Sequence, residues 1–91
     1  MLELVSISKI GDNWHLSRIV VNSEHISIIT EAVSYNNLHR EGKIDLGLNP
    51  KVTFSKVSMK GHSGFTDLIA IGSPEQILEK INTKAKILLK G

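Results

Sequence analysis

The stretch from residue 66 to residue 81 constrains the fold more than any other part of the sequence. A run of apolar and polar residues, Thr66–Ile71, stops at Gly72 and is followed by Ser73, a proline and an acidic residue. Ser73 is placed to accept a hydrogen bond from the backbone N–H of Gln76, whose side chain can reach back to the N–H of Ser73. Proline and a carboxylate both suit the first turn of a helix. The pattern predicts a strand that turns abruptly into a short helix over residues 73–82, with three residues facing the sheet: Ile77, Leu78 and Ile81.

The first third of the chain is predicted to form three strands. Leu2–Ile10 is rich in apolar residues and ends at a turn-prone Gly-Asp-Asn, after which Trp14–Val21 forms a second strand. We expect these two strands to pair as a hairpin. β-Branched residues dominate His25–Val33 and favour a third strand, with a short helical turn over Ser23–Ile26 as an alternative for its first residues.

The middle of the chain is predicted to be irregular. Residues 34–50 show little periodicity and contain several turn-prone pairs, so we expect a long loop, or a loop with a short edge strand over Lys43–Leu48. Loops of this length tend to be functional or mobile.

Two more strands complete the predicted sheet. In Lys51–Lys60 the apolar residues change parity between Phe54 and Val57, which indicates either a β-bulge near Ser55 and Lys56 or a strand buried on both sides. A last strand is predicted over residues 84–90, where apolar residues alternate with lysines.

These elements predict one small β-rich domain over residues 1–91. Its fold class is mainly β with one short helix (α+β): a strongly bent antiparallel sheet or small barrel of five or six strands, with the helix closing one open end. A chain of this length has room for one core.

Composition limits the location and the partners. The chain contains no cysteine, which excludes a disulfide framework and a thiolate zinc site and fits the cytoplasm. We expect neither a secretory signal nor a membrane span, because no apolar run approaches ~20 residues. Residues 51–91 carry seven lysines against three acidic residues. This basic second half could meet nucleic acid or another anion, or its lysines could simply solubilise the surface.

Two segments resemble the small FlbD-like proteins, a family associated with flagellar and swarming functions. The first is Val21-Asn22-Ser23-Glu24-His25-Ile26, and the second is Ser73-Pro74-Glu75-Gln76-Ile77-Leu78-Glu79-Lys80-Ile81. The resemblance implies a small β-rich domain with a terminal helix. It implies no catalytic residues.

The glycine-flanked loop Lys60–Gly64 is the best candidate for a ligand site. Two glycines would let backbone N–H groups turn toward one point, which suits an anion such as the phosphate of a nucleotide. A lysine, a histidine and a serine would add charge and hydrogen-bond donors. The alternative is an ordinary glycine-assisted hairpin turn. With the neighbouring aromatic residue and the long loop, the predicted ligand-binding residues are Lys60, Gly61, His62, Ser63, Gly64, Phe65, Tyr35, Arg40 and Lys43.

Catalysis and metal binding are weaker interpretations. His62, Ser63 and Asp67 have the residue types of a hydrolytic triad, but neighbours on an extended backbone point in opposite directions. His15 and His25 lie on neighbouring predicted strands without a metal-binding spacing. We therefore expect no catalytic residue, no metal and no cofactor, and we leave enzymatic activity an open but less favoured alternative.

The sequence thus favours a non-enzymatic binding module that forms homo-oligomers and binds an anionic small molecule or a protein partner. Phage and mobile-element accessory proteins often have this size, which makes the sequestering or blocking of a host factor a further hypothesis. The alternative function is RNA or DNA binding through the basic second half, with Tyr35 and Phe65 as the aromatic residues able to stack on a base. Three lysines, Lys84, Lys86 and Lys90, could track phosphates or protect a sheet edge.

Overall fold

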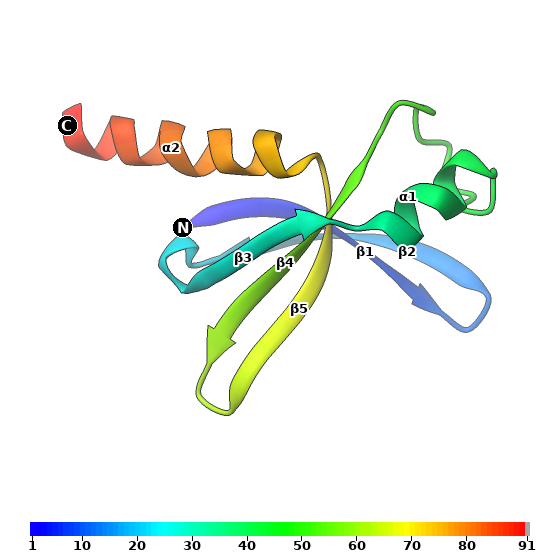
Figure 1. Cartoon of the computed structure of the whole chain (residues 1–91), viewed down its shortest axis with the longest axis horizontal. Helices are drawn as coiled ribbons and strands as arrows, with labels where there is room; N and C mark the ends of the chain where they lie inside the picture. Colours follow the sequence, from blue (N-terminus) through cyan, green and yellow to red (C-terminus); the bar gives the residue numbers. More distant parts are fainter. Residues whose placement is uncertain (91) are drawn as a thin grey trace.

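The computed structural model describes the backbone of residues 1–90 and the side chains of residues 1–83. Five antiparallel strands form one sheet in the order β2-β1-β5-β4-β3, accompanied by two α-helices and one 3₁₀ turn (Figure 1). The fold class is therefore mainly β, as predicted, with one more helix than expected. The strands are β1 (Leu2–Ile10), β2 (Asn13–Val21), β3 (Ile26–Glu31), β4 (Phe54–Gly61) and β5 (Gly64–Ile71), and the helical segments are η1 (Ser23–His25), α1 (Val33–Arg40) and α2 (Pro74–Lys90).

The first hairpin confirms the sequence prediction almost residue for residue. β1 and β2 pair without interruption from Leu2 with Val21 to Ile10 with Asn13. Gly11 opens the two-residue turn with a φ of 61°, a conformation that glycine adopts at little cost. The short helical turn that was the alternative for residues 23–26 is also present, as η1.

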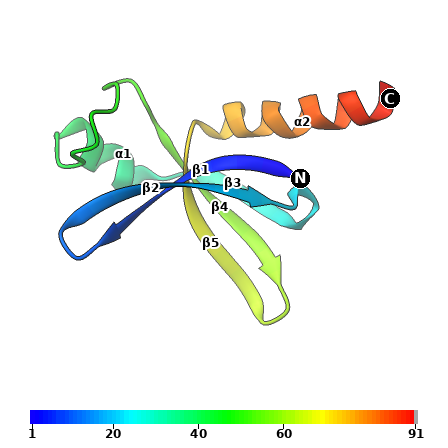
Figure 2. The ribbon, with the colours of Figure 1, turned by 180° about the vertical axis from the view of Figure 1, so that it is seen from behind.

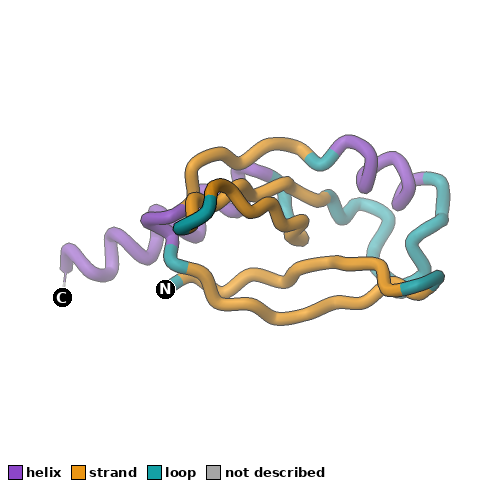
Figure 3. The backbone as a smooth tube through the Cα atoms, turned by 90° about the horizontal axis from the view of Figure 1, so that it is seen from below, coloured by secondary structure: helices purple, strands orange, loops and turns teal. Residues whose placement is uncertain are grey.

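The sheet is bent because its two halves meet at one point. β1 pairs with β5 at Ser6 and Ala70, and on either side of this pair the β1–β2 hairpin diverges from β5, β4 and β3 (Figures 1 and 2). Only residues 22–25 link the two edge strands β2 and β3, so the sheet must curl to bring these ends within reach (Figure 3). Because β2 and β3 do not pair with each other, the sheet stays open and no barrel closes among the described strands.

Each face of the sheet carries its own core. The first core holds Leu4 and Val57 from the sheet and Ile77 from α2. The second core holds Ile7 and Phe54 from the sheet, and α1 and the segment that follows it cover this face.

The central strand β4 explains the change of parity in the sequence. Phe54 is fully buried in the second core and Val57 is fully buried in the first. The pairing of β4 with β5 is regular from Phe54 to Gly61, so burial on both sides is correct and a bulge near Ser55 is not. The irregularity in register lies in β3, between Ile26 and Ile28.

The junction of β5 with α2 forms as its sequence predicts. The Gln76 N–H donates to Ser73 Oγ at 3.1 Å, and the Ser73 N–H donates to Gln76 Oε1 at 2.8 Å. Ile77 is buried and Ile81 packs against the first core. Leu78 was predicted to face the sheet as well, but its side chain is 52% exposed, so that part of the prediction was wrong.

Three other predictions need correction. The predicted strand over residues 84–90 is the continuation of α2, which runs to Lys90 and not to residue 82, so these lysines do not protect a sheet edge. The predicted loop over residues 34–50 begins with α1. The alternative edge strand at Lys43–Leu48 does not form; this segment is irregular and packs Ile44 into the second core. Neither α-helix of the described chain has the length and hydrophobicity that a membrane span requires.

Candidate functional site

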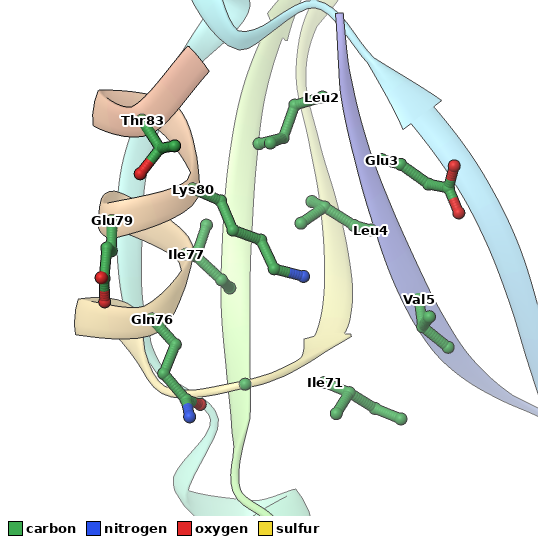
Figure 4. Close-up of a pocket in the computed structure, with 11 residues that line it drawn as sticks. Leu2, Glu3, Leu4, Val5, Ile71, Gln76, Ile77, Glu79, Lys80 and Thr83 are labelled. Atoms are coloured by element: carbon green, nitrogen blue, oxygen red, sulfur yellow. The ribbon is translucent and has the colours of Figure 1, made fainter. Parts of the chain in front are cut away.

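A groove lies on the described surface between α2 and β1. It encloses about 800 Å³, within the range of ligand pockets. Leu2, Leu4 and Ile77 point toward it (Figure 4) and are 3%, 1% and 1% exposed, so these core side chains form an apolar floor. The groove is the gap that remains where the helix covers the bent sheet next to its first strand.

Strand β1 contributes backbone as well as side chains to this groove. Glu3 and Val5 line it, although their side chains point away from it (Figure 4). The strand pairing explains why backbone of β1 is open to the groove. β1 pairs with β2 along its whole length, but it pairs with β5 only at Ser6 and Ala70. β5 then ends at the next residue, Ile71. The register places Ile71 opposite Val5, so the edge of β1 that faces α2 has no neighbouring strand over residues 2–4 among those described.

The polar side chains at the groove differ in what they already bind. Gln76 is engaged in the cap of α2, and Glu3 forms an ion pair with Arg18 at 2.7 Å on the far side of β1. Lys80 extends from α2 across the groove (Figure 4). The ion pairs among the side chains of residues 1–83 do not include Lys80. Glu79 also lines the groove and forms no ion pair among the described side chains, but its side chain lies on the side of α2 away from β1 (Figure 4). The ammonium group of Lys80 is thus the charge that is directed across the groove.

The predicted loop Lys60–Gly64 is the tight turn of the β4–β5 hairpin. Gly61 pairs with Gly64, and His62 and Ser63 form the turn. Gly64 has a φ of 119°, which favours glycine, whereas Gly61 has no positive φ. The positive φ at Gly64 thus belongs to the geometry of the turn and does not by itself indicate a ligand site. Every residue from 60 to 65 is exposed, and the Phe65 side chain is 66% exposed. The hairpin end lies in water, as expected, and its conformation matches the alternative of a glycine-assisted turn.

The other predicted ligand-binding residues lie on and after α1, where they contact their own chain. Tyr35 is half-buried, with its ring edge-on to Trp14 at 5.9 Å between ring centroids and tilted against Phe54 at 6.5 Å. Arg40 donates a hydrogen bond to the side chain of Asn37. Lys43 pairs with Glu41 at 3.2 Å, and its carbonyl accepts a hydrogen bond from Trp14.

The structure does not bring these two predicted groups together. α1 lies beside Phe54, the first residue of β4, whereas the turn follows Gly61, the last residue of that strand. At ~3.3 Å per residue the two ends of β4 are roughly 23 Å apart. Figure 1 accordingly shows α1 and the hairpin end in different parts of the molecule. The expectation of one surface built from both was wrong, and a ligand role for either group alone stays a prediction.

The residues weighed for catalysis and metal binding are also apart or engaged. Asp67 accepts a hydrogen bond from Ser58 Oγ at 2.7 Å and pairs with Lys56 at 3.5 Å, so it does not orient His62. The Ser58 hydroxyl, followed by the charge of Lys56, lowers the pKa of Asp67 in spite of an opposing desolvation effect. No group of three or more potential ligands for a metal ion occurs in the described residues.

The sequence did not point to the groove or to its lysine. Lys80 lies one turn beyond Ile77 and directly before Ile81, and this position on the edge of the apolar stripe is the signal that places it beside the sheet. The unpaired edge of β1 has no such signal, because it results from where β5 ends.

Comparison of the chain with protein-family models, curated proteins and solved structures finds no match.

Proposed function

We propose that this protein is a non-enzymatic binding module whose groove between α2 and β1 takes an apolar segment of a partner protein that carries a carboxylate. The observation that supports this most is the combination of an apolar floor with the ammonium group of Lys80 at its mouth. The partner follows from that chemistry, since apolar side chains would fill the groove and a carboxylate would pair with the lysine.

The groove is a better ligand site than the hairpin turn because it can remove a ligand from water. The turn residues from Lys60 to Gly64 are all exposed and enclose nothing. Contacts at such a surface are screened by solvent and salt, and exposed ion pairs contribute about 0–1 kcal/mol. The proposal includes the cytoplasmic location and the blocking of a host factor expected from the sequence.

The proposal is tested by titrating the full chain with a peptide probe, acetyl-Thr-Val-Thr-Glu-Thr-Val-amide, whose glutamate shares one face with its valines in an extended strand, and following backbone amide signals by NMR. We expect shifts centred on Leu4, Ile77 and Lys80. Lys80→Gln should weaken binding about two- to five-fold, because an ion pair with this exposed lysine contributes up to about 1 kcal/mol. Lys60→Gln is the matched control, because it removes the same charge at the hairpin turn and should leave the affinity unchanged. Shifts centred on the turn, or equal effects of the two substitutions, would contradict the proposal.

Nucleic-acid binding is a second candidate because of one exposed aromatic residue. Phe65 is 66% exposed and lies directly opposite Lys60 in the hairpin. An aromatic ring beside a lysine suits stacking of a single-stranded base. A labelled twelve-nucleotide oligouridine should then bind with an affinity that falls steeply with salt, and Phe65→Ala should weaken it at least five-fold. Tyr35, the other expected stacking residue, is half-buried between Trp14 and Phe54.

Self-association, also expected from the sequence, has support at the edge strand β2. Leu16 and Val20 on this strand are 40% and 62% exposed, and β2 has a free edge along its nine residues. Such edges invite pairing with a second copy. Native mass spectrometry of the purified protein would report copies and co-purified small molecules together, and a ligand-free monomer would count against self-association.

A further inference from the structure

We infer that the groove binds its partner by strand addition: an extended peptide pairs with the free edge of β1 over residues 2–4, and its carboxylate meets Lys80. This inference rests on the proposed function and specifies how the partner is held. Strand addition uses the partner's backbone for affinity and alternate side chains for selectivity.

The register of the first hairpin decides which backbone groups are available. In an antiparallel pair, the N–H and C=O groups of successive residues point alternately toward and away from the partner strand. The hairpin closes on Ile10 and Asn13 across a two-residue turn, so the even-numbered residues of β1 direct these groups to β2. The odd-numbered Glu3 and Val5 direct theirs to the opposite side, where both line the groove and Val5 lies opposite Ile71 of β5. A peptide at this edge would find the backbone groups of Glu3 without a strand partner.

The dimensions of the groove suit one short strand. Residues 2–4 of β1 span about 7 Å at ~3.3 Å per residue, and an added strand would lie about 4.8 Å from β1. It would continue the sheet position that β5 leaves at Ile71, with α2 along its other side. Alternate side chains of the peptide would point toward Leu2, Leu4 and Ile77, so apolar residues at every second position fit.

The charges beside the groove indicate which residues the peptide should carry. Glu3 is already paired with Arg18, and its side chain points away from the groove (Figure 4). Lys80 has no ion-pair partner among the described side chains and extends toward β1. A glutamate or aspartate in the peptide would therefore gain an oppositely charged group, whereas a lysine or arginine at that position would meet a like charge.

Methylated versions of the same peptide test the strand arrangement. N-methylation removes a backbone donor and leaves the side chains intact. Two forms, one methylated at the odd-numbered residues and one at the even-numbered residues, should behave differently, because only alternate N–H groups face β1. We expect one form to bind at least ten-fold more weakly than the parent peptide and the other to bind within about three-fold.

The matched change in the protein is Glu3→Pro against Glu3→Ala. Both remove the carboxylate that pairs with Arg18, but only proline removes the N–H that faces the groove. Proline is tolerated where a strand N–H faces outward, and circular dichroism during heating would verify that both variants fold. We expect Glu3→Pro to bind the parent peptide about five-fold or more weakly than Glu3→Ala. Nuclear Overhauser contacts should join peptide backbone protons to residues 2–4.

The outcomes separate this inference from the proposed function. If both methylated peptides bind like the parent and the two Glu3 variants bind equally, the groove takes a peptide but not as a strand, and the inference is overturned alone. If no peptide shifts the groove signals at about 1 mM, both are overturned. Concentration-dependent shifts of residues 2–4 without peptide would show a second copy in the groove, which also overturns the inference.

Discussion

At the scale of single residues, Asn36 fastens α1 to the sheet. Its side-chain oxygen accepts a hydrogen bond from the Phe54 N–H at 2.7 Å, and its amide nitrogen lies 3.5 Å from the Phe54 carbonyl. Asn36→Ala would leave the N–H of a fully buried residue without this partner, so we expect a loss of about 1–3 kcal/mol in the free energy of unfolding. Urea unfolding measures it, with the exposed Asn37→Ala as the control; equal losses would contradict this role.

Ser58 governs the ionisation of Asp67. The hydroxyl of Ser58 stabilises the carboxylate and lowers the pKa of Asp67 in the folded protein, with Lys56 as a smaller cause. The unfolded chain then binds more protons than the folded chain at acidic pH. The stabilising effect is therefore present above the unfolded pKa of about 4 and is lost as the pH falls through the lower folded pKa.

Ser58→Ala should raise the pKa of Asp67 toward its ordinary value, since the largest cause of the shift is removed. A carbon-detected NMR titration of the Asp67 carboxyl group measures this directly. Lys56→Gln is the comparison and should raise the pKa by less. A larger rise with Lys56→Gln than with Ser58→Ala would show that charge, and not the hydroxyl, holds the carboxylate.

At the scale of elements, the sequence predicts the parts whose signals are local. The β1–β2 hairpin forms from alternation and a glycine turn, and α2 begins where Ser73 and Gln76 can cap each other. The start of α1 has no such signal: its N-cap is Ala32, with no side-chain hydrogen bond. α1 exists because Tyr35, Leu38 and His39 pack on the second core and its rings, which are distant in sequence.

The end of α2 was missed for a different reason. The alternation of apolar residues and lysines over residues 84–90 fits a strand, but lysine, alanine and leucine are also strong helix formers. Asn82 and Thr83 do not stop a helix, and α2 continues through them. The groove was missed because it depends on where β5 leaves β1, a property of the assembled sheet.

The junction of β5 with α2 depends on the conformation of Gly72. Its φ is 122°, its N–H donates to the Thr53 carbonyl at 2.8 Å, and its carbonyl accepts from Ser55 Oγ at 2.7 Å. A β-carbon there would also lie 3.4 Å from Gln76 Oε1. We expect Gly72→Ala to lower the free energy of unfolding by about 1–3 kcal/mol, because side chains rarely adopt this φ.

Gly61→Ala is the matched control for this substitution. Gly61 has no positive φ, and its nearest neighbour would lie at 3.5 Å, an ordinary contact distance. Its effect on chemical unfolding should stay within about 0.5 kcal/mol. If the two glycine substitutions cost the same, the backbone at Gly72 does not carry the strain described above.

Across the molecule as a whole, the two faces of the sheet are covered in different ways. The second core is closed by α1 and residues 44–52, and most of the aromatic side chains of the chain pack in it. The first core is closed by α2 and keeps the groove along one side of that helix. The position of α2 therefore sets both the stability of this core and the shape of the proposed binding site.

Adjacent residues of α2 separate these two roles. Ile77 is 1% exposed, so Ile77→Ala would leave a cavity in the first core and should cost about 2–5 kcal/mol in chemical unfolding. Leu78→Ala should cost less than about 1 kcal/mol, since that side chain is 52% exposed. Both substitutions shorten an apolar side chain to the same residue on the same helical turn, so their difference reports burial rather than helix propensity.

Hydrogen exchange then shows whether α2 is held as a unit. If Ile77 anchors the helix to the sheet, Ile77→Ala should speed amide exchange in the first two turns of α2 more than in β4, and the peptide probe should bind more weakly than it does to Leu78→Ala. Uniform acceleration across the sheet and helix would mean that α2 opens only with global unfolding. In that case the groove would be a fixed part of the folded molecule, and its width would not depend on how tightly Ile77 holds the helix.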